Sequence, residues 1–222
     1  AVNIALPTIA GEFSLDAIEL SWVSSAYLLA SAAFLVPFGR IGDIFGRKKI
    51  LTGGVILFTL SSMGMIFSAS SLMLISFRLI QGVGASMIFG TAVAILTSVT
   101  EPTRRGQALG IYTTSVYIGL SAGPFIGGFL TDEFGWKSIF LINVPIGILI
   151  IALILFYLKG EWADAAGERF DLKGALIYGS SLTAVMIGFS EIPQVAGFFA
   201  LGLGIILLAL FIWLEHRERY PL

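Results

Sequence analysis

The sequence predicts an all-α membrane protein made of two inverted repeats of three helices, followed by two further spanning helices. Three observations support this fold class: long apolar runs, basic residues that collect on one side, and a motif that recurs after three spans. Of the 222 residues, 57% are hydrophobic and only 12% are charged, against about 25% in soluble domains. Since so few charges cannot cover a soluble core, we expect the helices to be surrounded by lipid.

Apolar runs of about 20 residues are expected to span the membrane, because a helix rises about 1.5 Å per residue and the hydrocarbon is ~30 Å thick. A shorter run at 1–10 indicates the end of one more helix, in a chain that we expect to be a piece of a longer protein. No run alternates at every second residue, as a barrel strand would. The seven complete runs cover residues 20–38, 50–67, 72–99, 107–130, 139–158, 174–189 and 195–214.

The basic residues predict the orientation of these helices, since cytoplasmic loops of membrane proteins are enriched in Lys and Arg. Of 13 basic residues, eleven follow the first, third, fifth and seventh complete spans, and the loops on the other side hold only Lys137. The side that carries the eleven is therefore expected to be cytoplasmic. They are Arg40, Arg47, Lys48, Lys49, Arg104, Arg105, Lys159, Arg169, Lys173, Arg217 and Arg219.

A repeated motif relates two parts of the chain. The segment GRIGDIFGRK at 39–48 returns 89 residues later as GFLTDEFGWK at 128–137, with Gly, Asp, Phe, Gly and Lys at the same spacing. Three spans separate the copies, so they face opposite sides of the membrane, as in inverted repeats related by an axis in the membrane plane. Coincidence between two glycine-rich turns is the alternative. An inverted repeat favours alternating access, because two near-equivalent packings expose one site to either side.

Several motifs, in order along essentially the whole chain, are similar to those of the major facilitator superfamily. GRIGDIFGRKK at 39–49 resembles the family's signature loop, and RLIQGVGAS at 78–86 resembles the fourth-helix motif of its proton-coupled exporters. GLSAGPFIGG at 119–128 resembles the fifth-helix motif of antiporters. The segments VNIALP at 2–7 and WKSIFLINVPIG at 136–147, with two helices after the sixth, resemble the fourteen-span drug:proton antiporter branch.

The resemblance implies a division of the chain into four parts. Residues 1–158 would form an N-terminal six-helix bundle with its first helix truncated, and residues 159–173 a cytoplasmic linker. Residues 174–214 would form two additional transmembrane helices. Residues 215–222 would lead on the cytoplasmic side to a C-terminal bundle that is missing from this sequence.

The loop at 39–49 is interpreted either as a basic turn that obeys the positive-inside rule or as a cytoplasmic gate. Asp43 favours the gate, because an acid is not needed on a positively charged face. The resemblance implies that Asp43 helps to latch the two bundles, partly through a helix N-terminus, while Gly39 and Gly46 permit a tight turn. Arg47 would pair with an acid near the end of the fourth helix, for which Glu101 is the local candidate.

Arg78 lies six residues into an apolar run, where a central arginine costs about 2.5–3.5 kcal/mol on insertion scales. Its long side chain either snorkels to the outer interface or faces the interior of the bundle. Gln81 lies one turn further on the same face, which favours the interior. The resemblance implies that Arg78 acts in proton coupling with an acid on the first helix, a few residues upstream of Val2.

Small residues in the run at 107–130 predict close helix packing. Gly119, Gly123 and Gly127 are spaced four apart, beside Pro124 and Gly128. Such spacing lets two helices approach closely, and proline favours a bend. Ordinary packing and a moving interface predict the same pattern, and the antiporter resemblance implies the moving interface.

Polar and aromatic residues in the spans are candidates for a cavity wall. Asn143, two residues before Pro145, is interpreted either as part of that wall or as part of a kink. Tyr27, Tyr112 and Tyr117 either line a cavity or pack between helices.

No enzyme class fits the sequence. It has no cysteine and no phosphate-binding loop with the required lysine. We therefore expect no catalytic residue, no metal and no cofactor, with a proton gradient as the energy source. A net charge of −1 predicts no electrostatic attraction to nucleic acid.

Taken with these residues, the resemblance implies a proton-coupled antiporter that exports amphipathic drugs or related organic compounds across a bacterial or archaeal plasma membrane. Its expected partners are the lipid bilayer, a small-molecule substrate, protons and the C-terminal half of the same transporter. Two alternatives stay open. One is a facilitator or symporter for a specific metabolite or anion, and the other is a non-transporting scaffold or sensor on the same fold.

Overall fold

The computed structural model describes residues 2–218 and 220–222. Ala1, the start of the expected helix fragment, and Arg219, one of the expected cytoplasmic cations, lie outside the described residues. In order along the chain, the elements are α1 (Val2–Phe13), α2 (Ala17–Phe45), α3 (Arg47–Ile66), α4 (Ser71–Val99), the 3-10 turn η1 (Pro102–Arg104), α5 (Arg105–Phe134), α6 (Ser138–Leu141), α7 (Asn143–Tyr157), α8 (Leu172–Glu191) and α9 (Val195–Glu215).

The predicted fold class is confirmed, because every expected apolar run is almost wholly helical and the described residues form no strand. The helices nevertheless extend beyond the apolar runs. The helix α2 begins at Ala17, where the Asp16 side chain accepts a hydrogen bond from the Glu19 amide at 2.7 Å, and the Glu19 side chain accepts one from the Asp16 amide. This capping box starts the helix outside the hydrocarbon, in polar residues that a search for apolar runs leaves out.

The expected span at 139–158 is divided into α6 and α7 at Ile142. Pro145 accounts for the break, because it has no N–H group to bond the carbonyl of Leu141 one turn before it. Asn143, beside the break, donates a hydrogen bond from Nδ2 to the Ile139 carbonyl at 3.4 Å. Together the two helices still form one span, Ser138–Tyr157.

Six helices of the described chain are long and apolar enough to cross a membrane, where the sequence analysis expects seven. The exception is α5, which has 30 residues and is not among those six. Its glycine, serine and threonine residues explain the difference. The expected span at 107–130 nevertheless lies within one continuous helix.

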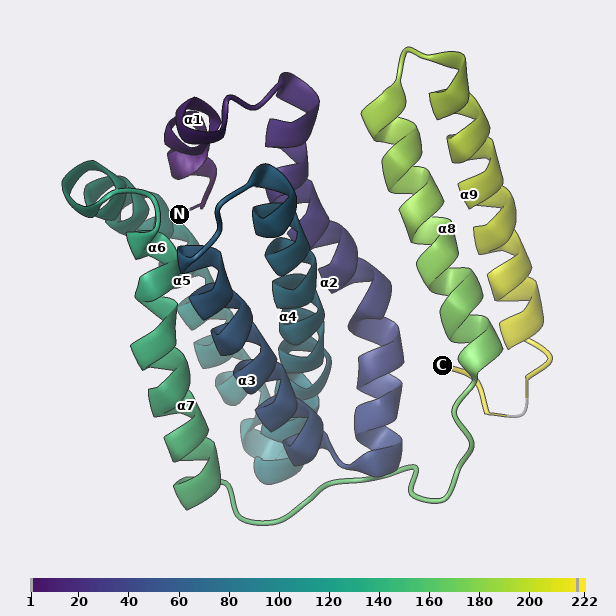
Figure 1. The fold of residues 1–222 in the computed structure, drawn as a ribbon. Helices are drawn as coiled ribbons and strands as arrows, with labels where there is room; N and C mark the ends of the chain where they lie inside the picture. The colour runs from purple at the N-terminus through teal and green to yellow at the C-terminus, as the bar shows by residue number, and fades with distance from the viewer. Residues whose placement is uncertain (1, 219) are drawn as a thin grey trace.

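The helices α2, α3 and α4 pack closely together, with α7 beside α3 and α1 beside α5 (Figure 1). Glycines bring the backbones of the central three helices together. A methyl group on Gly82 of α4 would lie 2.5 Å from the Tyr27 carbonyl of α2, and one on Gly84 would lie 2.7 Å from the Phe58 amide of α3. The α8–α9 hairpin lies to one side, against α2.

The inverted repeat is visible in how α2 and α5 end. The helix α2 ends at Gly46, with φ of +115°, and α5 ends at Gly135, with φ of +79°. Each glycine donates its N–H to the carbonyl four residues earlier, at 2.9 Å to Gly42 and 3.1 Å to Thr131. The two ends lie at opposite ends of the bundle (Figure 1), as expected for copies separated by three spans.

The segments that carry most of the basic residues lie at one end of the bundle, the lower end in Figure 1. They are the α2–α3 turn, the α4–α5 turn, and the segment between α7 and α8. We call this the cytoplasmic end, following the positive-inside rule. At the opposite, outer end, a buried apolar cluster joins α1, α2, α3, α4 and the α5–α6 turn, and includes Ile9, Val23, Met65, Leu74, Trp136 and Phe140.

Candidate functional site

A cavity of about 540 Å³ lies between the helices of the bundle. Most of its wall is apolar, and the polar groups come from α2, α4 and α7. It brings together seven of the residues that the sequence analysis singles out. They are Tyr27 from α2, Arg78 and Gln81 from α4, Gly119, Gly123 and Gly127 from α5, and Asn143 from α7.

Arg78 faces the interior of the bundle and not the outer interface. Its side chain is buried, with 7% of the residue surface exposed. Nε donates a hydrogen bond to the Val23 carbonyl at 2.9 Å, and Nη1 donates one to Gln81 Oε1 at 2.5 Å. The guanidinium also lies over the Tyr27 ring, 4.3 Å from its centroid, an attractive cation–π geometry. These contacts satisfy some of the hydrogen-bond donors of the guanidinium but do not neutralise its charge.

Gln81 connects Arg78 to α3. Its Nε2 donates a hydrogen bond to Ser62 Oγ at 2.8 Å, and Ser62 in turn donates to the Phe58 carbonyl at 2.8 Å. Both side chains are almost completely buried, so the chain of hydrogen bonds lies in surroundings that strengthen it. Sequence reasoning missed Ser62, for which the pair of serines in the run at 50–67 was the available signal.

The described residues supply no carboxylate partner for Arg78. All of the ion pairs among them lie at the two ends of the bundle, formed by Arg40, Arg47, Arg104 and Lys137. An arginine buried at membrane depth normally pairs with an acid or faces a polar pathway. Arg78 is therefore a cation with its hydrogen bonds partly made and its charge available to a ligand or to an acid.

The glycines of α5 form the side of the cavity that lacks side chains. A methyl group on Gly119 would meet no atom within 4 Å, so this part of the wall is open. Pro124 lies within α5, and Gly128 faces α1, where a methyl group would lie 3.7 Å from Ile4. The small residues of α5 thus border a cavity.

Tyr112 and Tyr117 do not line this cavity, unlike Tyr27. Helical phase is the reason. Tyr117 precedes Gly119 by two residues, which turns its side chain by roughly 200° around the helix, and the side chain is largely exposed. Tyr112 lies two turns before Gly119, roughly 10 Å nearer the cytoplasmic end, and is beyond the cavity.

The expected pairing of Arg47 with Glu101 is wrong. Arg47 Nε lies 2.6 Å from Asp43 Oδ1, Nη2 lies 2.8 Å from Asp164 Oδ2, and Nη1 donates to Ser98 Oγ at 3.1 Å. Glu101 instead lies 3.8 Å from Arg104, and both side chains are exposed. The cause is that α4 ends at Val99, so Glu101 lies beyond that helix, at the N-cap of the following 3-10 turn.

The segment 159–171 runs across the cytoplasmic end as a strap, and we use that name for it below. Its backbone binds the α2–α3 turn twice: the Arg47 amide donates to the Trp162 carbonyl at 2.8 Å, and the Ala165 amide donates to the Asp43 carbonyl at 3.0 Å. Asp43 thus contacts the strap through its backbone and Arg47 through its carboxylate. The described neighbours of Asp43 are therefore Arg47 of its own bundle and the strap.

Three acids of the strap bind three groups of the bundle. Glu161 accepts a hydrogen bond from the Lys48 amide at 2.8 Å, and so occupies the positive N-terminal end of α3. Asp164 pairs with Arg47, and Glu168 pairs with Arg40 at 2.5 Å. Sequence reasoning missed all three, although acids in a basic cytoplasmic linker were a usable signal.

Of the two gate glycines, Gly46 forms the positive-φ turn and Gly39 lies against α4. A methyl group on Gly39 would lie 3.6 Å from the Gly90 carbonyl. Gly39 therefore allows α2 and α4 to approach at the cytoplasmic end.

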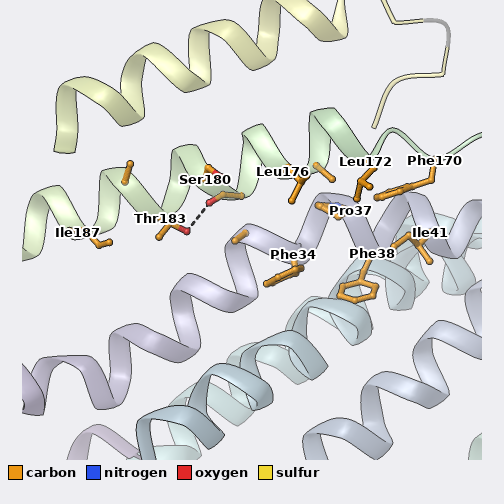
Figure 2. A pocket seen from close by; sticks show the side chains of 14 residues that line it. Phe34, Pro37, Phe38, Ile41, Phe170, Leu172, Leu176, Ser180, Thr183 and Ile187 are labelled. Atoms are coloured by element: carbon orange, nitrogen blue, oxygen red, sulfur yellow. Dashed lines mark hydrogen bonds between the residues drawn. The ribbon is translucent and has the colours of Figure 1, made fainter. Parts of the chain in front are cut away.

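A second concave site lies outside the bundle, in a groove of about 590 Å³ between α2 and α8 (Figure 2). Its lining is almost wholly apolar and includes none of the residues singled out from the sequence. Within the described part of the chain, no group of three or more His, Cys, Asp or Glu side chains is placed to hold a metal ion.

Comparison with known proteins agrees with the motifs. A family model described as Major Facilitator Superfamily matches residues 1–220. The chain is 37% identical to "Riboflavin transporter RibZ" of Clostridioides difficile (strain 630), over 98% of this chain and 47% of that protein. It is 35% identical to "Multidrug resistance protein Stp" of Mycobacterium tuberculosis (strain CDC 1551 / Oshkosh), over 100% of this chain and 42% of that protein.

A third relative is "Cephamycin export protein CmcT" of Amycolatopsis lactamdurans, which is 36% identical over 86% of this chain and 40% of that protein. The chain therefore spans less than half the length of these curated relatives.

Proposed function

This chain belongs to the Major Facilitator Superfamily, and we propose that it is the N-terminal portion of a proton-coupled antiporter that exports amphipathic organic compounds by alternating access. Membership of this family makes it a multi-pass protein of the plasma membrane and not an enzyme, and it requires no cofactor. The names of two relatives, a multidrug resistance protein and a cephamycin export protein, support export as the direction and organic compounds as the cargo.

The observation that carries the proposal is the burial of Arg78 beside a cavity. A guanidinium that is always charged and held at membrane depth requires a counter-charge for at least part of the cycle. In the proposed mechanism an acid on the first helix, upstream of Val2, supplies that charge when it is ionised. Protonation of the acid would weaken the pair with Arg78 and favour the other packing of the two repeats.

The cavity is the proposed substrate site. Gln81 and Ser62 would position the guanidinium, while Tyr27 and Asn143 supply further polar contacts on an apolar wall. A few polar groups in an apolar cavity of this size are typical of small-molecule sites. The part of the wall without side chains, at Gly119, Gly123 and Gly127, would admit bulky compounds. Pro124, which favours a bend in α5, would belong to the moving interface. Gly128 would keep α5 close to α1 during that movement.

The α2–α3 turn with the strap is the proposed cytoplasmic gate. Asp43 and Arg47 would hold the gate in the arrangement described above, with Gly39 and Gly46 allowing the close approach and the turn. Opening of this end would require Arg47 to release Asp164, because that pair joins the bundle to the strap. We propose that the chain is divided into four parts. They are a six-helix bundle at 1–158, a cytoplasmic linker at 159–173 that includes the strap, two additional helices at 174–214, and a segment at 215–222 that leads into a second bundle.

Reconstitution tests the proposal directly. The full-length protein would be placed in liposomes that contain a fluorescent cationic dye, and a pH gradient would then be imposed. We expect dye to move in the direction opposite to the proton flow, and to stop moving when a protonophore collapses the gradient. Dye movement that ignores the gradient would contradict proton coupling.

A second candidate function is a facilitator or symporter for a specific metabolite, which is favoured by the relative named as a riboflavin transporter. In that case Arg78 would bind an anionic or polar group of the substrate itself. Saturable transport of one compound, indifferent to pH and unable to move other amphipathic compounds, would support this function over the exporter.

A further inference from the structure

The groove between α2 and α8 is hollowed by small residues. Ala33 and Pro37 on α2 lie opposite Ala175 and Gly179 on α8, and Phe170 of the strap contributes to the cytoplasmic end. Figure 2 shows Pro37 on the side of α2 that faces α8, with α8 running alongside. The volume of about 590 Å³ lies within the range of small-molecule sites.

The groove is long enough to hold an acyl chain that spans one leaflet of a bilayer. Both flanking helices are long and apolar enough to span the membrane. The α8 lining begins at Leu172 on the cytoplasmic end and extends to Ile187, which is roughly 22 Å along the axis. A leaflet contributes about half of the ~30 Å hydrocarbon. An acyl chain is much thinner than a helix about 10 Å across, and it can lie in a groove of this volume.

The cytoplasmic end of the groove leads into a charged pocket of about 310 Å³, which shares Phe170 and Leu172 with it. Arg169 and Lys173 line this pocket, together with Asp171 and Glu218. The described residues give neither Arg169 nor Lys173 an ion-pair partner. Cations and carboxylates within one small pocket complement a headgroup that carries both a phosphate and an amine.

We propose that the groove and the charged pocket together bind one zwitterionic phospholipid of the cytoplasmic leaflet. An acyl chain would lie between α2 and α8, the phosphate would contact Arg169 and Lys173, and the amine would lie toward Asp171. The site is separate from the cavity around Arg78 and does not rest on the transport proposal. The lipid would fasten the α8–α9 hairpin to the bundle, where the described structure provides one side-chain hydrogen bond, from Tyr178 Oη to the Ala32 carbonyl at 3.4 Å.

Native mass spectrometry of the full-length protein in mild detergent tests the proposal. Phosphatidylethanolamine, phosphatidylglycerol and diacylglycerol with the same acyl chains would be titrated separately. We expect one phosphatidylethanolamine to bind about tenfold more tightly than diacylglycerol, since each tenfold step corresponds to about 1.4 kcal/mol, and more tightly than phosphatidylglycerol. Equal binding of all three would overturn the proposal, as would preferential binding of phosphatidylglycerol.

Two sets of variants locate the bound lipid. Gly179→Leu fills the groove without a clash, because a methyl group there meets no atom within 4 Å, and Gly202→Leu on α9 is its matched control with the same open surroundings. We expect the first variant to weaken phosphatidylethanolamine binding by about tenfold and the second to leave it unchanged. Equal binding by both variants would place the lipid elsewhere and overturn the site.

The headgroup contacts are tested by the double variant Arg169→Gln and Lys173→Gln, with Lys159→Gln as the control on the same linker. None of these three side chains is packed in the core, so all variants should fold. The double variant should remove the preference for phosphatidylethanolamine over diacylglycerol, and the control should keep it. A preference that persists in the double variant would contradict the assigned phosphate contact.

Discussion

Arg47 and Trp136 occupy equivalent positions in the two inverted repeats, 89 residues apart, and each binds an acid at its own end of the bundle. Arg47 pairs with Asp164 of the strap at 2.8 Å. Trp136 donates from Nε1 to Glu12 at the end of α1, at 2.5 Å. One repeat thus uses the position after its positive-φ glycine to close the cytoplasmic end, and the other uses it to close the outer end. The proposed alternating access would require these two contacts to open at different times.

The cytoplasmic contact is tested by Asp164→Asn, with Glu101→Gln as the control. Asp164 is largely exposed, and Arg47 keeps its contacts with Asp43 and Ser98 when Asp164 is changed, so the fold should stay intact while the strap loosens. We expect faster deuterium uptake in residues 159–171 of the Asp164 variant. The Glu101 variant should match the wild type, because Glu101 pairs with Arg104 and not with Arg47. Faster uptake in the Glu101 variant, with unchanged uptake in the Asp164 variant, would instead support Glu101 as the partner of Arg47.

The outer contact is tested by Trp136→Phe, with Trp213→Phe as the control. Trp136 is 2% exposed and packs edge-to-face against Phe13 and Phe140. The substitution keeps much of this ring packing but removes the hydrogen bond to a carboxylate, which contributes about 1.5–3 kcal/mol. We expect a lower thermal midpoint for Trp136→Phe and almost no change for Trp213→Phe, whose tryptophan is half exposed. Equal midpoints would show that Glu12 does not hold the α5–α6 turn.

The hydrogen bond between Gln81 and Ser62 is tested by two neighbouring serines of α3. Ser62→Ala leaves Gln81 Nε2 without its partner, at a cost of about 1–3 kcal/mol, and frees the side chain that holds Arg78. Ser61→Ala is the control, because the Ser61 hydroxyl bonds only backbone carbonyls of its own helix.

We expect Ser62→Ala to slow dye transport by about tenfold, the effect of about 1.4 kcal/mol on a barrier, with protein yield and monodispersity unchanged. Ser61→Ala should transport at the wild-type rate. Identical rates for the two variants would mean that Ser62 does not position Arg78.

The open wall of the cavity is tested by Gly119→Leu, with Gly110→Leu as the control on the same helix. A methyl group at either position meets no atom within 4 Å, but only Gly119 lines the cavity. Gly119→Leu should therefore fill the cavity without unfolding the bundle, and should exclude large substrates more strongly than small ones. Competition by dyes of increasing size would measure this. A size dependence shared by both variants would argue against the cavity as the substrate site.

The membrane helices and the repeat were accessible from the sequence because the bilayer imposes length and apolarity on every span. The orientation of Arg78 was accessible for a similar reason, since Gln81 marks the same helix face. The start of α2 was missed although its Asp16 and Glu19 have the spacing of a capping box, a signal that lies outside the apolar run.

The contacts of the strap were not accessible from the sequence. Glu161 and Glu168 bind groups more than a hundred residues away in the chain, and the irregular backbone of the strap has no periodicity from which to infer its path. Sequence distance favoured Glu101 as the partner of Arg47, whereas the fold supplies Asp164. Tyr112 and Tyr117 could not be placed for a different reason, because a residue on α5 can be assigned to the cavity only when the facing direction of that helix is known.

The most direct test of the account is the response of the full-length protein with Arg78→Gln to an imposed pH gradient in liposomes, compared with wild type and with Arg104→Gln. Gln keeps hydrogen-bonding capacity at this position but removes the charge. The account predicts that gradient-driven dye export falls to the level of empty liposomes in the Arg78 variant, while wild type and the exposed Arg104 variant export at equal rates. Undiminished, gradient-dependent export by a folded Arg78→Gln protein would contradict the role of this buried cation in coupling.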